Sequence, residues 1–167
     1  GSVLEFDKYE EDDNELGAIR CLNEDCPAQL ERRIIHFASK GAMNIDGLGP
    51  KAVRMFIDEG IISSVADVFR LDKERISSLP RMGDLSAENL IKATEAARSR
   101  GGVRLLYALG IRHVGISASE AIIGRFGSVE ALFDLTPDDF LSINDIGEIT
   151  AGHISEYFKR NSTKDLI

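Results

Sequence analysis

Between residues 47 and 53 the chain reads Gly-Leu-Gly-Pro-Lys-Ala-Val, and three related stretches follow it. Each has an apolar residue, a glycine, three variable residues and then a small or apolar residue. The other three read Arg81-Met82-Gly83-Asp84-Leu85-Ser86-Ala87, His113-Val114-Gly115-Ile116-Ser117-Ala118-Ser119 and Asp145-Ile146-Gly147-Glu148-Ile149-Thr150-Ala151. The aligned glycines, Gly49, Gly83, Gly115 and Gly147, are separated by 34, 32 and 32 residues. A nearly fixed period of this size indicates repeated supersecondary units.

Each stretch is expected to form the turn of a helix-hairpin-helix unit, with hairpins near residues 45–53, 79–87, 111–119 and 143–151. The turn glycines are expected to provide positive φ angles and close backbone approach. A small residue four positions after the aligned glycine lets the two helices pack closely. The second helix then presents unpaired N–H groups and the positive end of its dipole, which together suit a phosphate. Such a unit binds the DNA backbone without reading bases.

The remaining elements follow from local signals. Strand patterns are confined to residues 3–6 and 18–21, on either side of an acidic turn. Pro27 suits the first position of a helix that Gly41 should end. Further helices are expected at 65–71, at 87–99 with Ser86 as the cap, and after Thr136-Pro137. The predicted fold is mainly α, with four tandem helix-hairpin-helix units over residues 28–167 behind a β-hairpin, zinc-ribbon remnant at 1–27.

Charge restricts how such a chain binds DNA. The formal net charge is −8, of which residues 1–20 carry −5. The nearly neutral remainder is incompatible with binding by bulk positive charge but compatible with phosphate contacts from backbone N–H groups. No apolar run is long enough for a membrane span, and no signal peptide precedes the body. We therefore expect a soluble, intracellular protein with no membrane partner.

The four turns differ in their side chains. Hairpins two and three are predicted to contact DNA most, and hairpin four is predicted to be weak because Asp145 and Glu148 repel phosphate. Ordinary solvated surface is the alternative for Arg81 and Arg112. The candidate DNA-binding residues are Gly47, Gly49, Lys51, Arg81, Gly83, Arg112, His113, Gly115 and Gly147.

Cys21 and Cys26 are the two cysteines of the chain. Their C-x4-C spacing beside a predicted β-hairpin is typical of half of a four-cysteine zinc site, and two buried free thiols are the alternative. The pair is not a disulfide framework.

Two long strings carry a resemblance to a known family. Residues 21–30 read Cys-Leu-Asn-Glu-Asp-Cys-Pro-Ala-Gln-Leu, and residues 33–49 read Arg-Ile-Ile-His-Phe-Ala-Ser-Lys-Gly-Ala-Met-Asn-Ile-Asp-Gly-Leu-Gly. They resemble the zinc finger and first hairpin of bacterial NAD-dependent DNA ligases. Residues 105–115, Leu-Leu-Tyr-Ala-Leu-Gly-Ile-Arg-His-Val-Gly, are similar to the third hairpin region of that family. The resemblance covers nearly the whole chain.

The resemblance implies a role in DNA replication and repair. The family seals nicks by adenylating a lysine from NAD, transferring AMP to the 5′-phosphate and joining the 3′-hydroxyl. That chemistry lies in upstream domains, and the Lys-x-Asp-Gly signature of the adenylated lysine is absent here. The implied partners are duplex DNA, preferably nicked, and the upstream ligase domains. The implied cofactors of the parent protein are zinc and NAD.

Several further expectations depend on the extent of the chain. It lacks the first cysteine pair of the family, so Cys21 and Cys26 are expected to form a half-site, and the chain alone is expected to be inactive. Gly1-Ser2 is either a cloning scar or native sequence.

Two other classes of function remain open at this stage. A helix-hairpin-helix glycosylase or lyase needs a nucleophilic lysine near a hairpin, and Lys51 and Lys92 are the candidates. A protein-interaction module is compatible with the acidic balance, and a salt-sensitive affinity for duplex DNA would distinguish it from a DNA clamp.

Overall fold

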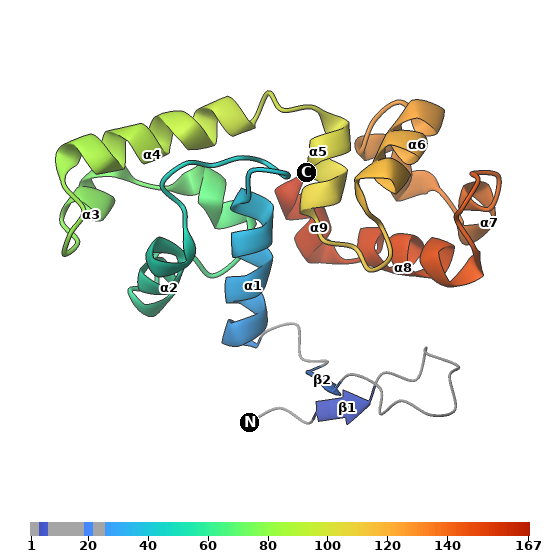
Figure 1. Ribbon diagram of the computed structural model, residues 1–167, viewed down its shortest axis with the longest axis horizontal. Coiled ribbons are helices and arrows are strands. Elements are labelled where there is room, and N and C mark those ends of the chain that lie inside the picture. Colours follow the sequence, from blue (N-terminus) through green and yellow to red (C-terminus); the bar gives the residue numbers. More distant parts are fainter. Residues whose placement is uncertain (1–3, 7–18, 22–25) are drawn as a thin grey trace.

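The computed structural model describes residues 4–6, 19–21 and 26–167, and its body is built from short helices (Figure 1). In chain order the elements are β1 (Leu4–Phe6), β2 (Ile19–Cys21), α1 (Pro27–Ala38), α2 (Pro50–Asp58), the 3₁₀ helix η1 (Ala66–Arg70), α3 (Lys73–Ser77), α4 (Asp84–Ala97), α5 (Gly102–Ala108), α6 (Ile116–Phe126), the 3₁₀ helix η2 (Glu130–Asp134), α7 (Pro137–Phe140), α8 (Glu148–Phe158) and α9 (Asn161–Leu166). The predicted mainly α fold is confirmed for the described residues.

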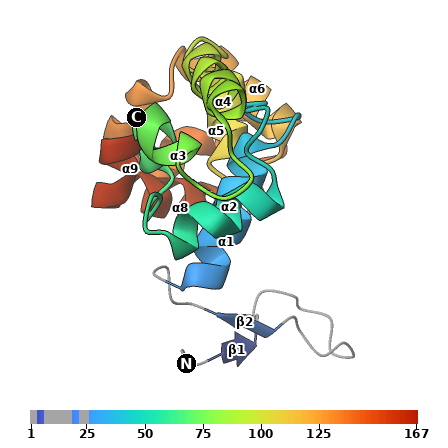
Figure 2. The ribbon, with the colours of Figure 1, turned by 90° about the vertical axis from the view of Figure 1, so that its left-hand side faces the viewer.

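β1 and β2 form an antiparallel pair in which Glu5 lies opposite Arg20. Both strands fall where the sequence predicted them, and the acidic turn between them lies outside the described residues. Both views of the ribbon place the pair beyond the first turn of α1 (Figures 1 and 2). The side-chain amide of Gln29 in α1 donates a hydrogen bond to the carbonyl oxygen of Cys21, which ties β2 to that helix.

Consecutive helices pack in pairs: α1 with α2, α3 with α4, α5 with α6 and α7 with α8. Each pair encloses one of the four repeated stretches, which confirms four helix-hairpin-helix units. Pro27 is the first residue of α1, as predicted. Thr136 caps α7 through a capping box, in which its backbone N–H and hydroxyl both donate to the Asp139 carboxylate at 2.7 Å.

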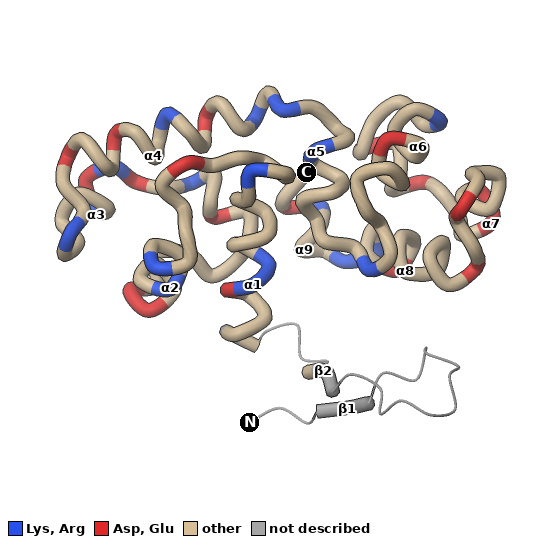
Figure 3. The backbone as a smooth tube through the Cα atoms, viewed as in Figure 1, with Lys and Arg blue, Asp and Glu red and all other residues tan. Residues whose placement is uncertain are grey.

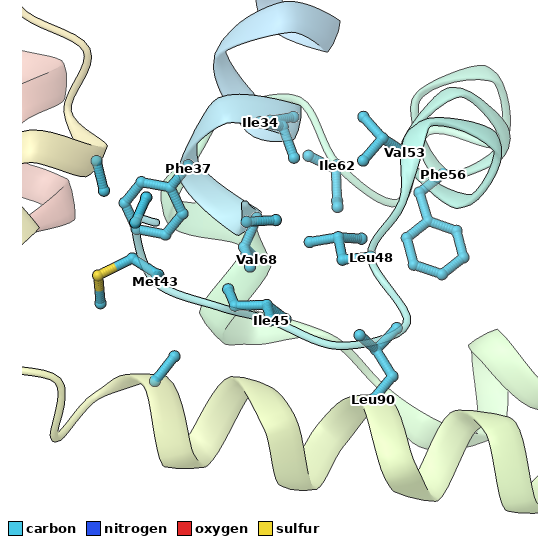
Figure 4. Packing of buried hydrophobic residues seen from close by; sticks show 14 of the residues in the cluster. Ile34, Phe37, Met43, Ile45, Leu48, Val53, Phe56, Ile62, Val68 and Leu90 are labelled. Atoms are coloured by element: carbon cyan, nitrogen blue, oxygen red, sulfur yellow. The ribbon is translucent and has the colours of Figure 1, made fainter. Parts of the chain in front are cut away.

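The buried apolar residues form two clusters. Figure 4 shows the first, in which Ile45 and Leu48 on either side of the first turn lie among side chains from α1, α2 and α4. The second cluster joins helices α5 to α8 around Leu106, Ile122 and Phe140. Hairpins one and two therefore share one core, and hairpins three and four share the other.

Apolar and polar contacts connect these two halves. Leu105 and Leu166 pack against both clusters. Arg104 in α5 donates a hydrogen bond to the carbonyl oxygen of Ala42 at 3.0 Å. His36 in α1 is half-buried, and its Nε2 lies 2.9 Å from the Tyr107 carbonyl oxygen. The halves are thus held together by apolar and polar contacts.

Two local expectations were wrong and a third is confirmed. The first helix ends at Ala38, three residues before Gly41, and the backbone turns at Ser39. The short helix expected at 65–71 is present as a 3₁₀ helix at 66–70, whose start is fixed by hydrogen bonds from Ser63 and Ser64 to the Asp67 carboxylate. Ser86 is not a cap, because α4 begins earlier, at Asp84. In the described part of the chain, no helix is long and apolar enough to cross a bilayer.

Candidate nucleic-acid interface

The four turns share one pattern of backbone hydrogen bonds. In each, the residue before the aligned glycine donates its N–H to a carbonyl three residues earlier, at 3.0–3.3 Å. The aligned glycine accepts a hydrogen bond from the residue four positions later, at 2.9 or 3.0 Å. The donors of this second bond are Val53, Ala87, Ser119 and Ala151. The repeat in the sequence is therefore a repeat in backbone geometry.

Those four donor residues lie between the paired helices. All four have no exposed side-chain surface. The hydroxyl of Ser119 also donates to the Gly115 carbonyl oxygen at 2.9 Å, so the polar member of the set is hydrogen-bonded in its buried position. A small residue was predicted at this place, and Ala87, Ser119 and Ala151 are small and buried there, whereas hairpin one buries the larger Val53.

The left-handed position of each turn lies two residues before the aligned glycine. The φ angles there are 89° at Gly47, 68° at Arg81, 63° at His113 and 65° at Asp145. An L-residue in this conformation costs roughly 1–2 kcal/mol relative to a favoured one. Three of the four hairpins keep the same turn although they carry a side chain at this position.

The aligned glycines themselves do not adopt positive φ, so that part of the expectation was wrong for them. Gly49, Gly83, Gly115 and Gly147 have φ between −82° and −99° with extended ψ, a conformation open to any residue. A Cβ atom built on each would meet nothing within 4 Å in the described part of the chain. Neither backbone strain nor internal packing therefore requires glycine there. A close approach from outside would require it.

Each aligned glycine is also the N-cap of the second helix of its hairpin. No side chain among the described residues caps these four helices. The first-turn N–H groups, such as those of Ser117 and Ala118 in α6, lack the intrahelical partners that later residues have. The structure therefore presents four exposed sets of amide donors, each beside a glycine.

Acidic side chains distinguish the hairpins. Asp84 lies in the first turn of α4 and Glu148 in the first turn of α8, whereas α2 and α6 have no acid there. Asp145 adds a second exposed acid to hairpin four. Figure 3 shows acidic positions gathered on α7 and at the start of α8. A carboxylate near a helix N-terminus already interacts with the dipole and repels a phosphate.

The candidate cations of the first half differ in whether they are paired. Arg54 forms a 2.8 Å ion pair with Glu31, and this hydrogen bond raises the pKa of Arg54. The Nζ atom of Lys92 lies 2.6 Å from the Oε1 atom of Glu88, so these two side chains form an ion pair. Lys51 and Arg81 are exposed, and no carboxylate of the described residues lies within ion-pair distance of either.

In hairpin three, Arg112 is half-buried and its Nε is buried, so it is not ordinary solvated surface. His113 is exposed and stacks on His153 of α8, with ring centroids 5.5 Å apart and planes 16° from parallel. This stack joins the turn of hairpin three to the second helix of hairpin four.

The cysteine pair lies at the junction of β2 and α1. Cys21 ends β2, and Cys26 is the N-cap residue of α1. Backbone hydrogen bonds from Gln29 and Ala28 lower the pKa of the Cys26 thiol, and Cys21 contributes a weaker side-chain hydrogen bond. No group of three or more metal-binding side chains occurs among the described residues, so the half-site stays a prediction.

Sequence reasoning missed two features of this surface. The first is the acid in the first turn of α4, which was visible at Asp84 but was not weighed against Arg81. The second is a groove between α2 and the turn before α4, which includes Met55 and Met82. No local pattern signals it, because it is formed by packing one hairpin beside the next.

Comparisons with known proteins match this architecture. Residues 104–167 match the family model of a helix-hairpin-helix motif, and residues 40–96 match that of a SAM-like helix-hairpin-helix tandem. The chain is 44% identical over 146 residues to a DNA ligase of Methylacidiphilum infernorum, covering 87% of the chain and 21% of the ligase. It is 42% identical over 150 residues to a DNA ligase of Anoxybacillus flavithermus and 41% identical over 150 residues to one of Geobacter sulfurreducens, covering 90% of the chain and 22% of each ligase. The chain thus spans about a fifth of the length of these relatives.

Proposed function

We propose that this chain, whose helix-hairpin-helix region is similar to part of DNA ligases, binds the backbone of duplex DNA. In this proposal it acts as a clamp for a longer protein that seals nicks. The observation that carries the proposal is the set of four exposed helix N-termini, each preceded by a glycine whose Cβ would meet nothing within the described part of the chain. A DNA phosphate approaching these amides needs the space that a side chain would fill.

The charge distribution supports binding through amides and a few cations. Residues 26–100 contain 12 Lys and Arg against 10 Asp and Glu, whereas residues 101–167 contain 6 against 9. Neither half carries enough positive charge for strong binding by bulk attraction. Contacts of this kind hold the phosphates in register and read no base sequence.

Ligase activity belongs in this proposal to the longer protein. The relatives are named DNA ligases, and the chain matches only about a fifth of each. We propose that NAD and the adenylated lysine are supplied outside the matched region, and that nicked duplex is the preferred substrate. A lyase is less consistent with the structure, because Lys51 and Lys92 are exposed and Lys92 is paired with Glu88.

The same proposal extends to zinc. Cys21 and Cys26 fit two corners of a tetrahedral structural site, because both belong to the β2–α1 junction and the start of α1 favours the Cys26 thiolate. A structural zinc needs four protein ligands, so two more must come from outside the described residues. Bound zinc would hold β2 and α1 together.

Titration of fluorescent DNA with the chain tests the function. We expect affinity for nicked and intact duplex in the range of about 1–100 μM near physiological salt, weakening steeply as salt rises. The same titration on single strands should give weaker binding, because two strands of a duplex present phosphates at fixed separation to the rigid hairpins. Absence of duplex binding at low salt would contradict the proposal and favour a protein partner.

A further inference from the structure

We propose that the cavity where the two halves meet binds a small aromatic carboxylate. The cavity encloses about 240 Å³. Its lining comes from α1, the segment 63–66, α5, α8 and α9, and Figure 1 shows α9 beside α5 at the middle of the molecule. In the described part of the chain, none of the four turns contributes a residue to this lining. The cavity is therefore separate from the surface proposed for DNA.

The charge of the lining favours an anion. Among the described residues that line the cavity, Arg33 of α1 is the one Lys or Arg, and no Asp or Glu is present. Arg33 is half-buried and its Nε is buried, so its attraction for an anion is screened less than at an exposed site. A guanidinium has five N–H donors, so Arg33 can keep its contacts in the folded chain and still donate to a carboxylate.

The acid nearest to the lining segment in sequence, Asp67, is already compensated. Its carboxylate accepts hydrogen bonds from the N–H and hydroxyl of Ser63 and from the N–H of Ser64, at 2.8–2.9 Å. It also lies 3.6 Å from Nη1 of Arg70. The Asp67 side chain does not line the cavity, so its charge is balanced by groups other than Arg33.

Hydroxyl groups complete the polar side of the cavity. Ser64 and Ser162 both line it, and neither hydroxyl makes a hydrogen bond within the described part of the chain. The hydroxyl of Thr163 donates to the Tyr157 carbonyl oxygen at 2.8 Å and is therefore already used. A carboxylate has about four lone-pair sites, so it can accept from Arg33 and from a serine at once.

The rest of the lining suits a single ring. Leu30 and Phe37 of α1, Leu109 of α5 and Leu166 of α9 contribute apolar side chains. A cavity of about 150 Å³ holds a benzene ring, whereas drug-sized ligands occupy about 300–1,000 Å³. The volume of this cavity lies between the two, so it fits one ring that carries a short acidic substituent.

A ligand in this cavity would contact both halves at once. Phe37 belongs to the first apolar cluster, Leu109 belongs to the second, and Leu166 packs against both. A ligand that binds only the folded chain therefore strengthens the junction between the halves. At ten times its dissociation constant it should raise the melting temperature by about 3–6 °C.

Phenylacetate is the probe for the test, and phenylacetamide and acetate separate its two parts. NMR titration of the methyl groups should give a dissociation constant of about 0.1–1 mM for phenylacetate, with shifts concentrated at Leu30, Leu109 and Leu166. Phenylacetamide lacks the charge and acetate lacks the ring, so each should bind at least about tenfold more weakly. Equal affinity for phenylacetate and phenylacetamide, shifts confined to other residues, or no saturable binding of phenylacetate up to about 10 mM would overturn the proposal.

Two neighbouring arginines of α1 provide matched variants. Arg33→Gln removes the cation of the cavity, and Arg32→Gln removes an exposed arginine that does not line it. The first should weaken phenylacetate binding about tenfold or more, and the second should change it less than about twofold. Arg33→Lys keeps the charge and should recover part of the affinity.

Equal effects of the two glutamine variants would overturn the role of Arg33. Thermal unfolding checks that each variant is folded. If Arg33→Gln unfolds, the comparison of phenylacetate with phenylacetamide on the unmodified chain decides the question. Because the cavity and the turns share no residue, the outcome is independent of whether the chain binds DNA.

Discussion

Changing Gly115 to alanine separates DNA binding from folding. The Cβ would project into open space from an extended N-cap residue, so it meets no clash within the described chain. Alanine is a poorer N-cap residue than glycine by about 0.5–1 kcal/mol, and each kcal/mol shifts the melting temperature of a domain this size by about 2–4 °C. We therefore expect Gly115→Ala to lower the melting temperature by about 1–4 °C.

Its effect on DNA binding should be much larger. The methyl group occupies the space through which a phosphate would reach the amides of Ser117 and Ala118. Hydrogen bonds to a charged group contribute about 1.5–3 kcal/mol, which corresponds to a loss of about 10- to 100-fold in affinity. Fluorescence anisotropy on intact duplex at low salt measures this loss.

Gly124→Ala provides the matched control, because Gly124 lies in the same helix and a Cβ there also meets nothing in the described chain. Alanine inside a helix is favoured over glycine by about 0.8–1.0 kcal/mol, so this variant should be more stable and bind DNA unchanged. A Gly115→Ala variant that binds as tightly as the unmodified chain would refute the phosphate role of this turn.

Other predictions address charge, pH and packing. The double variant Asp145→Asn/Glu148→Gln should raise the affinity for duplex DNA about two- to fivefold, because it neutralises two acids beside the N-terminus of α8. Fluorescence anisotropy measures this change. An unchanged affinity would place hairpin four away from DNA. Hydrogen bonds from the side chain and backbone of Thr136 lower the pKa of Asp139. These bonds therefore stabilise the folded state at neutral pH, and their contribution is lost as the pH falls below about 4 and Asp139 is protonated. Thr136→Ala should raise the Asp139 pKa in an NMR titration, and an unshifted curve would count against this capping box. Ala151→Leu should destabilise the fold by about 1–3 kcal/mol through overpacking in thermal or urea unfolding, while Ala121→Leu on the exposed face of α6 should change stability little. Equal stability of these two variants would contradict the tight crossing of α7 and α8.

The fold was largely predictable because its signals are local and repeated. Gly49, Gly83, Gly115 and Gly147 mark the turns, and the buried residue four positions later identifies the helix crossing. Local patterns did not predict which residue of each turn takes the positive φ angle. The left-handed residue is an arginine, a histidine or an aspartate in three hairpins, and these residue types do not signal positive φ by themselves.

The candidate site was only partly predictable. The sequence named Lys51 and Arg81 as separate candidates, and their joint groove depends on how α2 packs beside the next turn. The short helix after Ser63 and Ser64 was predicted, but its 3₁₀ type was not; three hydrogen bonds to the Asp67 carboxylate favour this tighter local start. Burial alone would raise the pKa of Asp67, and those hydrogen bonds outweigh it and hold that pKa below its usual value.

The contacts between the two halves have a consequence for native-state hydrogen exchange. Leu105 and Leu166 pack against both apolar clusters, and Arg104 of α5 donates a hydrogen bond to the segment after α1. Opening either half would expose apolar surface on the other, so separate sub-global openings are disfavoured. The slowest amide protons of α4 and α8 should then exchange through one shared opening, with the same dependence on denaturant.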